Sequence, residues 1–305
     1  MSLVARSFVR VPATTTNLGP GFDCLGLALG LYNELALEMH DDAGDPVIKI
    51  EGEGAQALPR DNSNLMVKAA RSVIADRTPR RLVFKAKNNI PLARGLGSSA
   101  AAIVAGLFAA NRLLRKPALS REQLFQYAAV LEGHPDNVAP AIYGGLTAVV
   151  KENKDFKFYP LKAHPRLGAV VCVPDFELPT SQARAVLPNS VLRNDAVENI
   201  SRALLLTPAL EKGRWDWLAQ AMKDSLHQPY RAALVPGFNE VLQAARQAGI
   251  CGAALSGAGS SILALCPKGP DAAKIGRAMV AAFSSHGVKS RALVLPIDRE
   301  GVRVK

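Results

Sequence analysis

The chain lacks the features that mark several large classes of protein. Its four cysteines have no metal-binding or redox spacing, so we expect reduced thiols buried in the core of a cytoplasmic protein. They are Cys24, Cys172, Cys251 and Cys266. The longest uncharged stretch, residues 248–267, is interrupted by glycines and serines and predicts strand, turn and strand. Residues 1–10 contain no apolar segment typical of a secretory signal, and we expect no contact with a membrane.

Aromatic residues are also scarce, at 6% of the chain, although the formal net charge is +11. Lysines and arginines are spread along the sequence and no known nucleic-acid-binding motif is present, so we expect no nucleic-acid partner. A positive balance suits small anionic ligands instead. With 305 residues, 49% of them hydrophobic, the chain can bury a large core in one domain or two.

Hydrophobic residues alternate between the strand period and the helix period, which predicts an α+β fold. A charged segment at 151–157 and the prolines after it predict a boundary that divides residues 1–160 from residues 161–305. A β-α-β ending predicts an α/β sandwich for the second domain. Strands are predicted at residues 4–11, 25–38, 47–51, 82–87, 146–150, 156–159, 167–173, 252–255, 261–266 and 290–295. Helices are predicted at 63–75, from after residue 97 to about 114, and at 120–131, 196–206, 215–224, 239–248 and 271–284, with a capping box at Ser120 and Gln123.

The stretch between the fourth strand and the second helix is the most informative part of the sequence. Gly95 and Gly97 let the backbone approach a ligand closely, and the following helix presents unpaired N–H groups and the positive end of its dipole. Such a helix start binds anions, most often phosphate. The hydroxyls of Ser98 and Ser99 can add a phosphate contact and a ligand for Mg²⁺. We therefore expect a nucleoside triphosphate to contact Pro91, Leu92, Ala93, Arg94, Gly95, Leu96, Gly97, Ser98, Ser99, Ala100 and Ala101.

This loop differs from the two common phosphate-binding motifs. A Walker A motif needs a lysine directly before its Ser or Thr, where this chain has Gly97. The dinucleotide fingerprint needs three glycines, and only two are present. Taken alone, the loop can also be interpreted as an ordinary Gly-Ser helix start.

Two further segments concentrate polar side chains near predicted strand and helix ends. Residues 12–23 are polar and rich in turn residues, and Asn17 and Asp23 are either ligand contacts or ordinary turn caps. Residues 132–137 place two carboxylates, a histidine and an amide within six positions, which packing alone explains poorly. These side chains are Glu132, His134, Asp136 and Asn137.

Two arginines and a second glycine-rich loop follow in the other half of the chain. Arg184 and Arg231 stand one turn into short predicted helical segments, where a solvated helix charge is the alternative interpretation. Residues 252–261 contain a second Gly-Ser loop between strands, for which a tight hairpin turn is the alternative.

Together these segments resemble the GHMP kinases, a family that includes galactokinase and mevalonate kinase. Residues 91–100 match the family pattern Pro-x-x-x-Gly-Leu-Gly-Ser-Ser-Ala, and residues 256–259 match its C-terminal glycine motif. The segments around residues 12–23, 132–137, 180–184 and 227–231 are most similar to the branch of the family that phosphorylates L-homoserine. The resemblance extends from Val11 to Leu265.

The resemblance implies an N-terminal domain like domain 2 of ribosomal protein S5 and a ferredoxin-like C-terminal domain. It implies a homodimer that transfers phosphoryl from ATP, with Mg²⁺, to L-homoserine, giving O-phospho-L-homoserine on the route to threonine. Another alcohol such as mevalonate or a sugar is the alternative substrate. A catalytically inactive nucleotide sensor is the alternative from a different class of protein.

Carried onto this chain, the resemblance also implies a role for individual residues. Ser98 and Glu132 would hold Mg²⁺, and Asn62 and Lys87 would border the nucleotide. A guanidinium suits the carboxylate of an amino acid, and Asp23 is the best candidate for its ammonium. The implied contacts to the amino acid are Asn17, Asp23, His134, Arg184 and Arg231.

The resemblance leaves the choice between two neighbouring side chains open. Mevalonate kinases carry an aspartate that can act as a base, and the match falls on Asp136 or Asn137. We expect Asn137 to contact the reacting hydroxyl and Asp136 to be structural, so that Asn137, Glu132 and Ser98 are the predicted catalytic residues. A general base contributes only ~10²–10⁴-fold, so a kinase can work without one.

Overall fold

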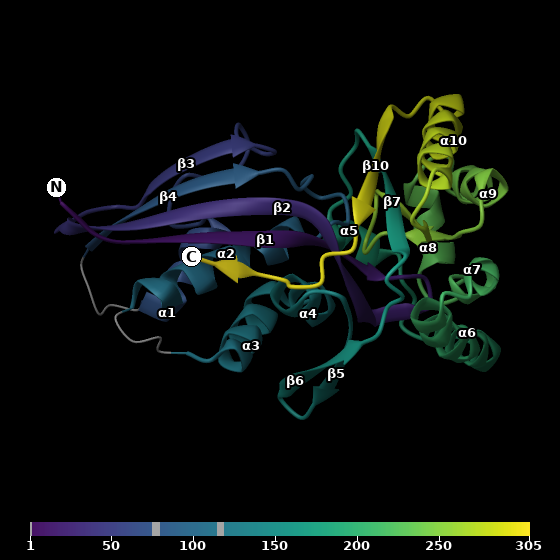
Figure 1. Ribbon diagram of the computed structural model, residues 1–305, viewed down its shortest axis with the longest axis horizontal. Coiled ribbons are helices and arrows are strands. Elements are labelled where there is room, and N and C mark those ends of the chain that lie inside the picture. The colour runs from purple at the N-terminus through teal and green to yellow at the C-terminus, as the bar shows by residue number, and fades with distance from the viewer. Residues whose placement is uncertain (1, 75–79, 115–118) are drawn as a thin grey trace.

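A hairpin of two long strands lies at the centre of the first of two sheets (Figure 1). The computed structural model describes residues 2–74, 80–114 and 119–305. The first sheet consists of β1 (Leu3–Asn17), β2 (Gly21–Ala43), β3 (Val47–Gly52), β4 (Arg80–Asn88), β5 (Leu146–Glu152), β6 (Asp155–Leu161) and β11 (Arg303–Val304). β1 and β2 are antiparallel, β4 lies on the far side of β2, and β3 runs parallel to β4. The hairpin therefore carries the polar segment between β1 and β2 to one end of the sheet.

Helices cover one face of this sheet (Figure 1). They are α1 (Leu65–Ile74), α2 (Ser98–Leu113), α3 (Arg121–Glu132) and α4 (Pro135–Tyr143). α2 is buried on nearly all sides, because it packs against α1, α3, α4 and the sheet. Gly106 permits this approach, since a Cβ there would collide with the carbonyl oxygen of Met66. The packing fixes the start of α2, where the glycine-rich loop ends.

The second sheet has the strand order β10-β7-β9-β8 with antiparallel neighbours. Its strands are β7 (Leu167–Pro174), β8 (Gly252–Leu255), β9 (Ile262–Pro267) and β10 (Ser290–Pro296). α9 (Phe238–Ala248) and α10 (Asp271–Ser285) complete two β-α-β units, which gives the predicted ferredoxin-like sandwich.

Both faces of the second sheet are covered, so all residues of β7 are buried. Val170 and Cys172 pack with α9 and α10 in one hydrophobic cluster. Ala169 and Val171 belong to another cluster, which also contains the core of the first sheet and the inner sides of α6 (Arg193–Lys212) and α7 (Trp215–Ala221). The alternation of strand side chains thus divides β7 between two cores.

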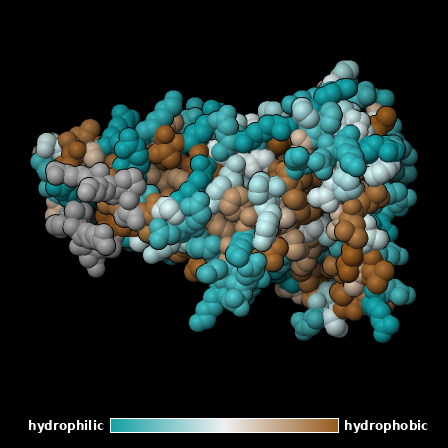
Figure 2. All heavy atoms as spheres, turned by 60° about the horizontal axis from the view of Figure 1, so that its bottom comes forward, coloured by the Kyte–Doolittle hydropathy of each residue, from teal (hydrophilic) through white to brown (hydrophobic). Residues whose placement is uncertain are grey.

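The outer side of α6 is apolar and exposed. Val197, Ile200 and Leu204 are 59%, 60% and 71% exposed, and their spacing places them on one face of the helix. Figure 2 shows apolar side chains gathered in a stripe on this part of the surface, at the right of the view.

Most predicted elements are confirmed. The capping box of α3 has Ser120 Oγ accepting from the Gln123 N–H, while the Gln123 side chain accepts from the Ser120 N–H. Strand, turn and strand occupy residues 248–267 as predicted. The predicted helix at 63–75 is found as α1, and residue 75 lies outside the described residues. Within the part of the chain that the structure describes, no helix is both long and apolar enough to cross a membrane.

Other predictions were wrong in detail. No helix was predicted at the position of α4. Pro135 stands at the first helical position, where no N–H is needed, and α4 tolerates Pro140 inside it. α6 likewise continues past Pro208 to Lys212. Cys24 is exposed, while the other three cysteines are buried as expected.

The predicted domain boundary at residue 160 falls near the end of β6 and stays a prediction. After β10 the chain returns to the first sheet, where β11 pairs with β1. Asp298 secures this return: its Oδ2 accepts from Tyr32 Oη at 2.9 Å and from Arg303 Nη2 at 2.8 Å. The last residues therefore belong to the first sheet.

Candidate active site

A cavity of about 580 Å³ opens between the two halves of the chain. One side comes from the β1–β2 connection, the start of α2 and the segment from the end of α3 into α4. The other side comes from α5 (Thr180–Ala185), α8 (Gln228–Arg231) and the loop after β8. Apolar side chains also line the cavity, among them Leu58, Pro59, Leu65, Met66 and Leu92.

The glycine-rich loop presents the start of α2 to the cavity. Gly97 precedes the helix with φ +68°, and no side chain caps the helix there. A Cβ at Gly97 would collide with Thr14 Oγ1, and one at Gly95 would collide with the carbonyl oxygen of Ser256. Glycine is needed at both positions, and the uncapped N–H groups of α2 remain available to a phosphate.

The second glycine-rich loop supports the first one. Ser256 Oγ donates to the Gly95 carbonyl oxygen at 2.6 Å, and the Gly257 N–H donates to the Thr16 carbonyl oxygen at 3.2 Å. Gly257 and Ala258 also line the cavity. The loop therefore does more than turn the chain between β8 and β9, since it hydrogen-bonds to the first glycine-rich loop directly.

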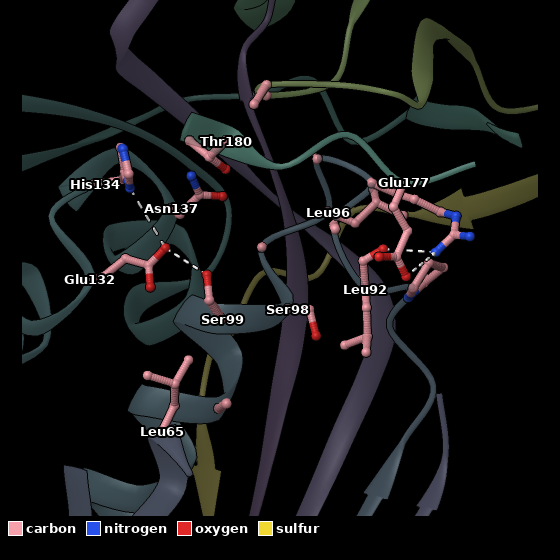
Figure 3. Close-up of a pocket in the computed structure, with 18 of the residues that line it drawn as sticks. Leu65, Leu92, Leu96, Ser98, Ser99, Glu132, His134, Asn137, Glu177 and Thr180 are labelled. Carbon is pink, nitrogen blue, oxygen red and sulfur yellow. Dashed lines mark hydrogen bonds and ion pairs between the residues drawn. The ribbon is translucent and has the colours of Figure 1, made fainter. Parts of the chain in front are cut away.

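Glu132 lies beside the start of α2, at the end of α3 (Figure 3). Its Oε1 accepts from Ser99 Oγ at 2.7 Å and lies 3.8 Å from His134 Nδ1. Ser98 also lines the cavity, but its hydroxyl makes no hydrogen bond to the described residues. The Glu132 carboxylate thus holds the first turn of α2 while facing the space where phosphates would lie.

The donor set here fits Mg²⁺. Glu132 and Ser98 offer hard oxygen ligands in the same cavity, and Mg²⁺ keeps several waters, so few protein ligands are needed. Among the described residues, no group of three or more His, Cys, Asp or Glu could hold a metal ion alone. A cation shared with a bound phosphate is the arrangement that these oxygens suit.

Asp136 and Asn137 lie in the first turn of α4 and differ sharply in their surroundings. Asn137 Oδ1 accepts from Thr14 Oγ1 at 2.9 Å, which leaves the amide N–H₂ free to face the cavity. Asp136 is buried and its Oδ1 accepts from the Asn137 N–H at 3.0 Å. Burial raises the pKa of Asp136 to about 6, and the nearby charge of Asp23 adds to the shift.

Arg184 connects two other predicted substrate contacts. Its Nη2 donates to Asp23 Oδ1 at 2.7 Å and its Nε donates to His134 Nε2 at 3.1 Å. Because His134 Nε2 accepts, its Nδ1 carries the proton and faces Glu132. The Glu132 carboxylate raises the pKa of His134, so acidification favours a charged ring that no longer accepts from Arg184.

Arg231 and Asn17 are buried against the same cavity. The Arg231 side chain lies over the ring of Phe22, with Cζ 5.3 Å from the ring centroid. Asn17 Nδ2 donates to the Gly257 carbonyl oxygen at 2.9 Å, and its Oδ1 accepts from the Asp23 N–H at 3.0 Å. Asn17, whose backbone φ is +69°, thus stabilises the turn that leads to Asp23.

The structure brings most of the predicted site residues to one cavity. Loop residues 91–99 line it, whereas Ala100 and Ala101 are packed in the core behind them. Asn62 and Lys87 are exposed and do not line it; their neighbours do. The polar lining residues that the sequence did not single out as contacts are Thr16, Asn33, Ser63, Asn64, Asn88, Glu177 and Thr180. The polar pattern Ser-Asn at 63–64 was the available signal for two of them.

Comparison with known proteins gives consistent matches along the whole chain. Residues 64–145 match the GHMP kinases N terminal domain, and residues 206–285 match the GHMP kinases C terminal domain. A homoserine kinase from Moorella thermoacetica is 48% identical over 92% of this chain and 94% of its own. One from Trichormus variabilis is 42% identical over 99% of both chains. The crystal structure of homoserine kinase from Cytophaga hutchinsonii has a TM-score of 0.89 and 31% identity, covering 100% of this chain and 99% of its own.

The chain therefore belongs to the GHMP kinase family, with the two-domain fold and the ATP dependence of that family. The full-length relatives named above are homoserine kinases.

Proposed function

We propose that the protein transfers the γ-phosphoryl group of ATP to the hydroxyl of L-homoserine, giving ADP and O-phospho-L-homoserine for threonine synthesis. One observation carries the proposal: Asp23, Arg184 and Arg231 line the same cavity as the start of α2. A carboxylate and guanidinium groups match the ammonium and carboxylate of an amino acid. The helix start matches the phosphates of ATP. The names of the full-length relatives support the same substrate.

Positioning explains how this site would accelerate the reaction. Phosphoryl transfer has a loose transition state, so orientation and charge neutralisation contribute most, and orientation alone can supply ~7–11 kcal/mol. In this proposal the loop at residues 91–99 holds the triphosphate, while Asp23 and the two arginines hold the amino acid. Asn137 donates from its free amide to the reacting hydroxyl, since Thr14 fixes the other end of that amide.

Glu132 and Ser98 would hold Mg²⁺ in the same proposal. The ion, when bound, supplies charge neutralisation for the phosphate oxygens. Ser99 keeps the Glu132 carboxylate in place through its 2.7 Å hydrogen bond.

The test is release of ADP from ATP in the presence of Mg²⁺ and L-homoserine, beside L-serine, mevalonate and galactose. We expect turnover on homoserine that EDTA abolishes. Mevalonate has a carboxylate but no ammonium for Asp23, and galactose has neither group. Turnover on one of them alone would therefore reject the amino-acid assignment and keep the phosphate site. ATP binding without turnover on any of the four would favour an inactive sensor.

The proposal includes a homodimer in the cytoplasm, as the resemblance implies. The exposed apolar stripe of α6 (Val197, Ile200 and Leu204) supports self-association. Light scattering should give a mass near twice the 32.4 kDa of the chain. A Leu204→Glu variant should reduce that mass if the stripe contributes.

A further inference from the structure

Protein acceptors already occupy one side of the Arg231 guanidinium. Arg231 Nε donates to the Ala183 carbonyl oxygen at 2.9 Å, and Nη1 lies 3.3 Å from the Gly257 carbonyl oxygen and 3.2 Å from His227 Nδ1. Nη2 makes no hydrogen bond to any residue in the described ranges, and Arg231 lines the cavity. A guanidinium has five N–H donors, so the two on Nη2 are left for a ligand.

His227 is the one side chain among these acceptors, and its surroundings set its tautomer. His227 Nε2 lies 2.9 Å from the Gly19 carbonyl oxygen, which can only accept. Nε2 therefore carries the proton, and Nδ1 is an acceptor facing Arg231. Burial lowers the pKa of His227, which keeps the ring neutral at physiological pH.

The ring of His227 has little freedom to move. It is 0% exposed and stacks on Phe22, with ring centroids 4.9 Å apart and planes 20° apart. The backbone at the start of α8 is also held, because Asp224 Oδ2 accepts from the N–H groups of His227 at 2.9 Å and Gln228 at 2.7 Å. A rigid acceptor beside the Arg231 guanidinium helps to fix the direction in which it points.

The charges around Arg231 favour a neutral His227 ring as its neighbour. Burial lowers the pKa of Arg231 to about 10, and the positive charge of Arg184 contributes. A charged imidazole at 3.2 Å would add a third cation and remove the acceptor. A neutral histidine instead holds the guanidinium in place without neutralising its positive charge. That charge stays available for the carboxylate of a ligand.

We propose that His227 is a positioning residue, whose Nδ1 orients Arg231 so that Nη2 faces the carboxylate of the amino-acid substrate. This inference rests on the proposed function. His227 itself does not touch the substrate in this arrangement, since it does not line the cavity. Replacing His227 should therefore weaken only the binding of the substrate carboxylate, which is the group that Arg231 contacts.

Two amide variants separate the roles of the two ring nitrogens. His227→Asn places an amide oxygen near the position of Nδ1 and keeps an acceptor for Arg231. His227→Gln places an amide nitrogen near the position of Nε2 and keeps the donor to Gly19 but loses that acceptor. Each variant removes one hydrogen bond of the ring, so the two are matched for loss of stability, which thermal unfolding checks.

The readout is kinetics with L-homoserine and with 3-aminopropan-1-ol, which is homoserine without its carboxylate. We expect His227→Gln to raise KM for homoserine about tenfold to a hundredfold, the effect of weakening one hydrogen bond to a charged group. His227→Asn should recover most of that loss. Neither variant should change KM for ATP or kcat/KM for 3-aminopropan-1-ol by more than a few-fold.

Equal KM values for homoserine in the two variants would overturn the positioning role, as would an equal loss on both substrates. A wild-type protein that does not turn over homoserine would overturn the proposed function, and this inference with it. Wild-type turnover combined with indistinguishable variants would overturn this inference alone.

Discussion

Asp23 and Arg184 form an ion pair across the cavity, with Arg184 Nη2 2.7 Å from Asp23 Oδ1. Asp23 belongs to β2 and Arg184 to α5, so the pair joins the two halves of the chain. The side chains are 43% and 37% exposed. An amino acid bound between them would exchange this internal pair for two new ones, ammonium with Asp23 and carboxylate with Arg184.

Replacing Asp23 by Asn should weaken amino-acid binding. We expect KM for homoserine to rise about tenfold to a hundredfold, because one charge-assisted hydrogen bond is lost. The midpoint of thermal unfolding should change little, since a half-exposed ion pair contributes only ~0–1 kcal/mol. Asp216→Asn is the matched control, because it removes an exposed pair with Arg214 on a surface that does not line the cavity. Unchanged kinetics in Asp23→Asn would remove Asp23 from the substrate site.

Glu132 and the two neighbouring serines should respond differently to substitution. Glu132→Gln should lower kcat by about 10²–10³-fold, because the Mg²⁺ that would neutralise charge on the phosphate oxygens loses a charged ligand. Ser98→Ala should raise the Mg²⁺ concentration needed for half-maximal rate. Ser99→Ala should have a smaller effect, because its hydroxyl contacts Glu132 and not the expected ion. Rates measured across a Mg²⁺ titration check all three, and a wild-type titration curve for Glu132→Gln would reject the metal role.

The buried carboxyl of Asp136 should make stability depend on pH. Its folded-state pKa of about 6 exceeds the ordinary value of 3.8, so the folded protein binds the proton more tightly than the unfolded chain. Stability should therefore fall as pH rises from about 4 to about 6, and stay lower above that. Asp136→Asn should raise the free energy of unfolding at pH 8 by up to ~3 kcal/mol, and by much less at pH 4. Urea unfolding at both pH values is the measurement, and an equal effect at the two would contradict the assignment.

Substitutions of Asn137 and Asp136 should also have different effects on kcat. Asn137→Ala should lower kcat by at least ~10²-fold, because the donor to the reacting hydroxyl is lost. Asp136→Asn keeps the acceptor for the Asn137 N–H and should lower kcat far less. The pH profile of kcat/KM decides between them. An acidic limb near pH 6 that disappears in Asp136→Asn would make Asp136 the base.

Local patterns in the sequence sufficed to predict the glycine-rich loop at the start of α2 and most of the secondary structure. The glycines at 95 and 97 and the uncapped start of α2 are properties of a short segment, so the segment alone reveals them. The contacts of Ser256 with Gly95 and of Thr14 with Asn137 join residues more than a hundred positions apart. No local pattern specifies such a pair.

Two of the predicted nucleotide contacts show how a shift of one position changes which side chain lines the cavity. Lys87 was predicted to border the nucleotide, but its neighbour Asn88 lines the cavity. Successive side chains on a strand point to opposite faces, so a shift of one residue on β4 moves a side chain from the cavity to the solvent. The same difference of one or two positions separates Asn62 from the lining residues Ser63 and Asn64.

The hydrophobic cluster that runs from the first sheet through Ala169 and Val171 of β7 has a consequence for how the protein denatures. The two family domains are separate modules of sequence, yet neither can expose its side of this cluster without disrupting the other. Heat or urea should therefore melt the chain in a single transition, with the calorimetric and van't Hoff enthalpies equal. A fragment ending near residue 160 should aggregate or remain unfolded, so the chain behaves as one cooperative folding unit.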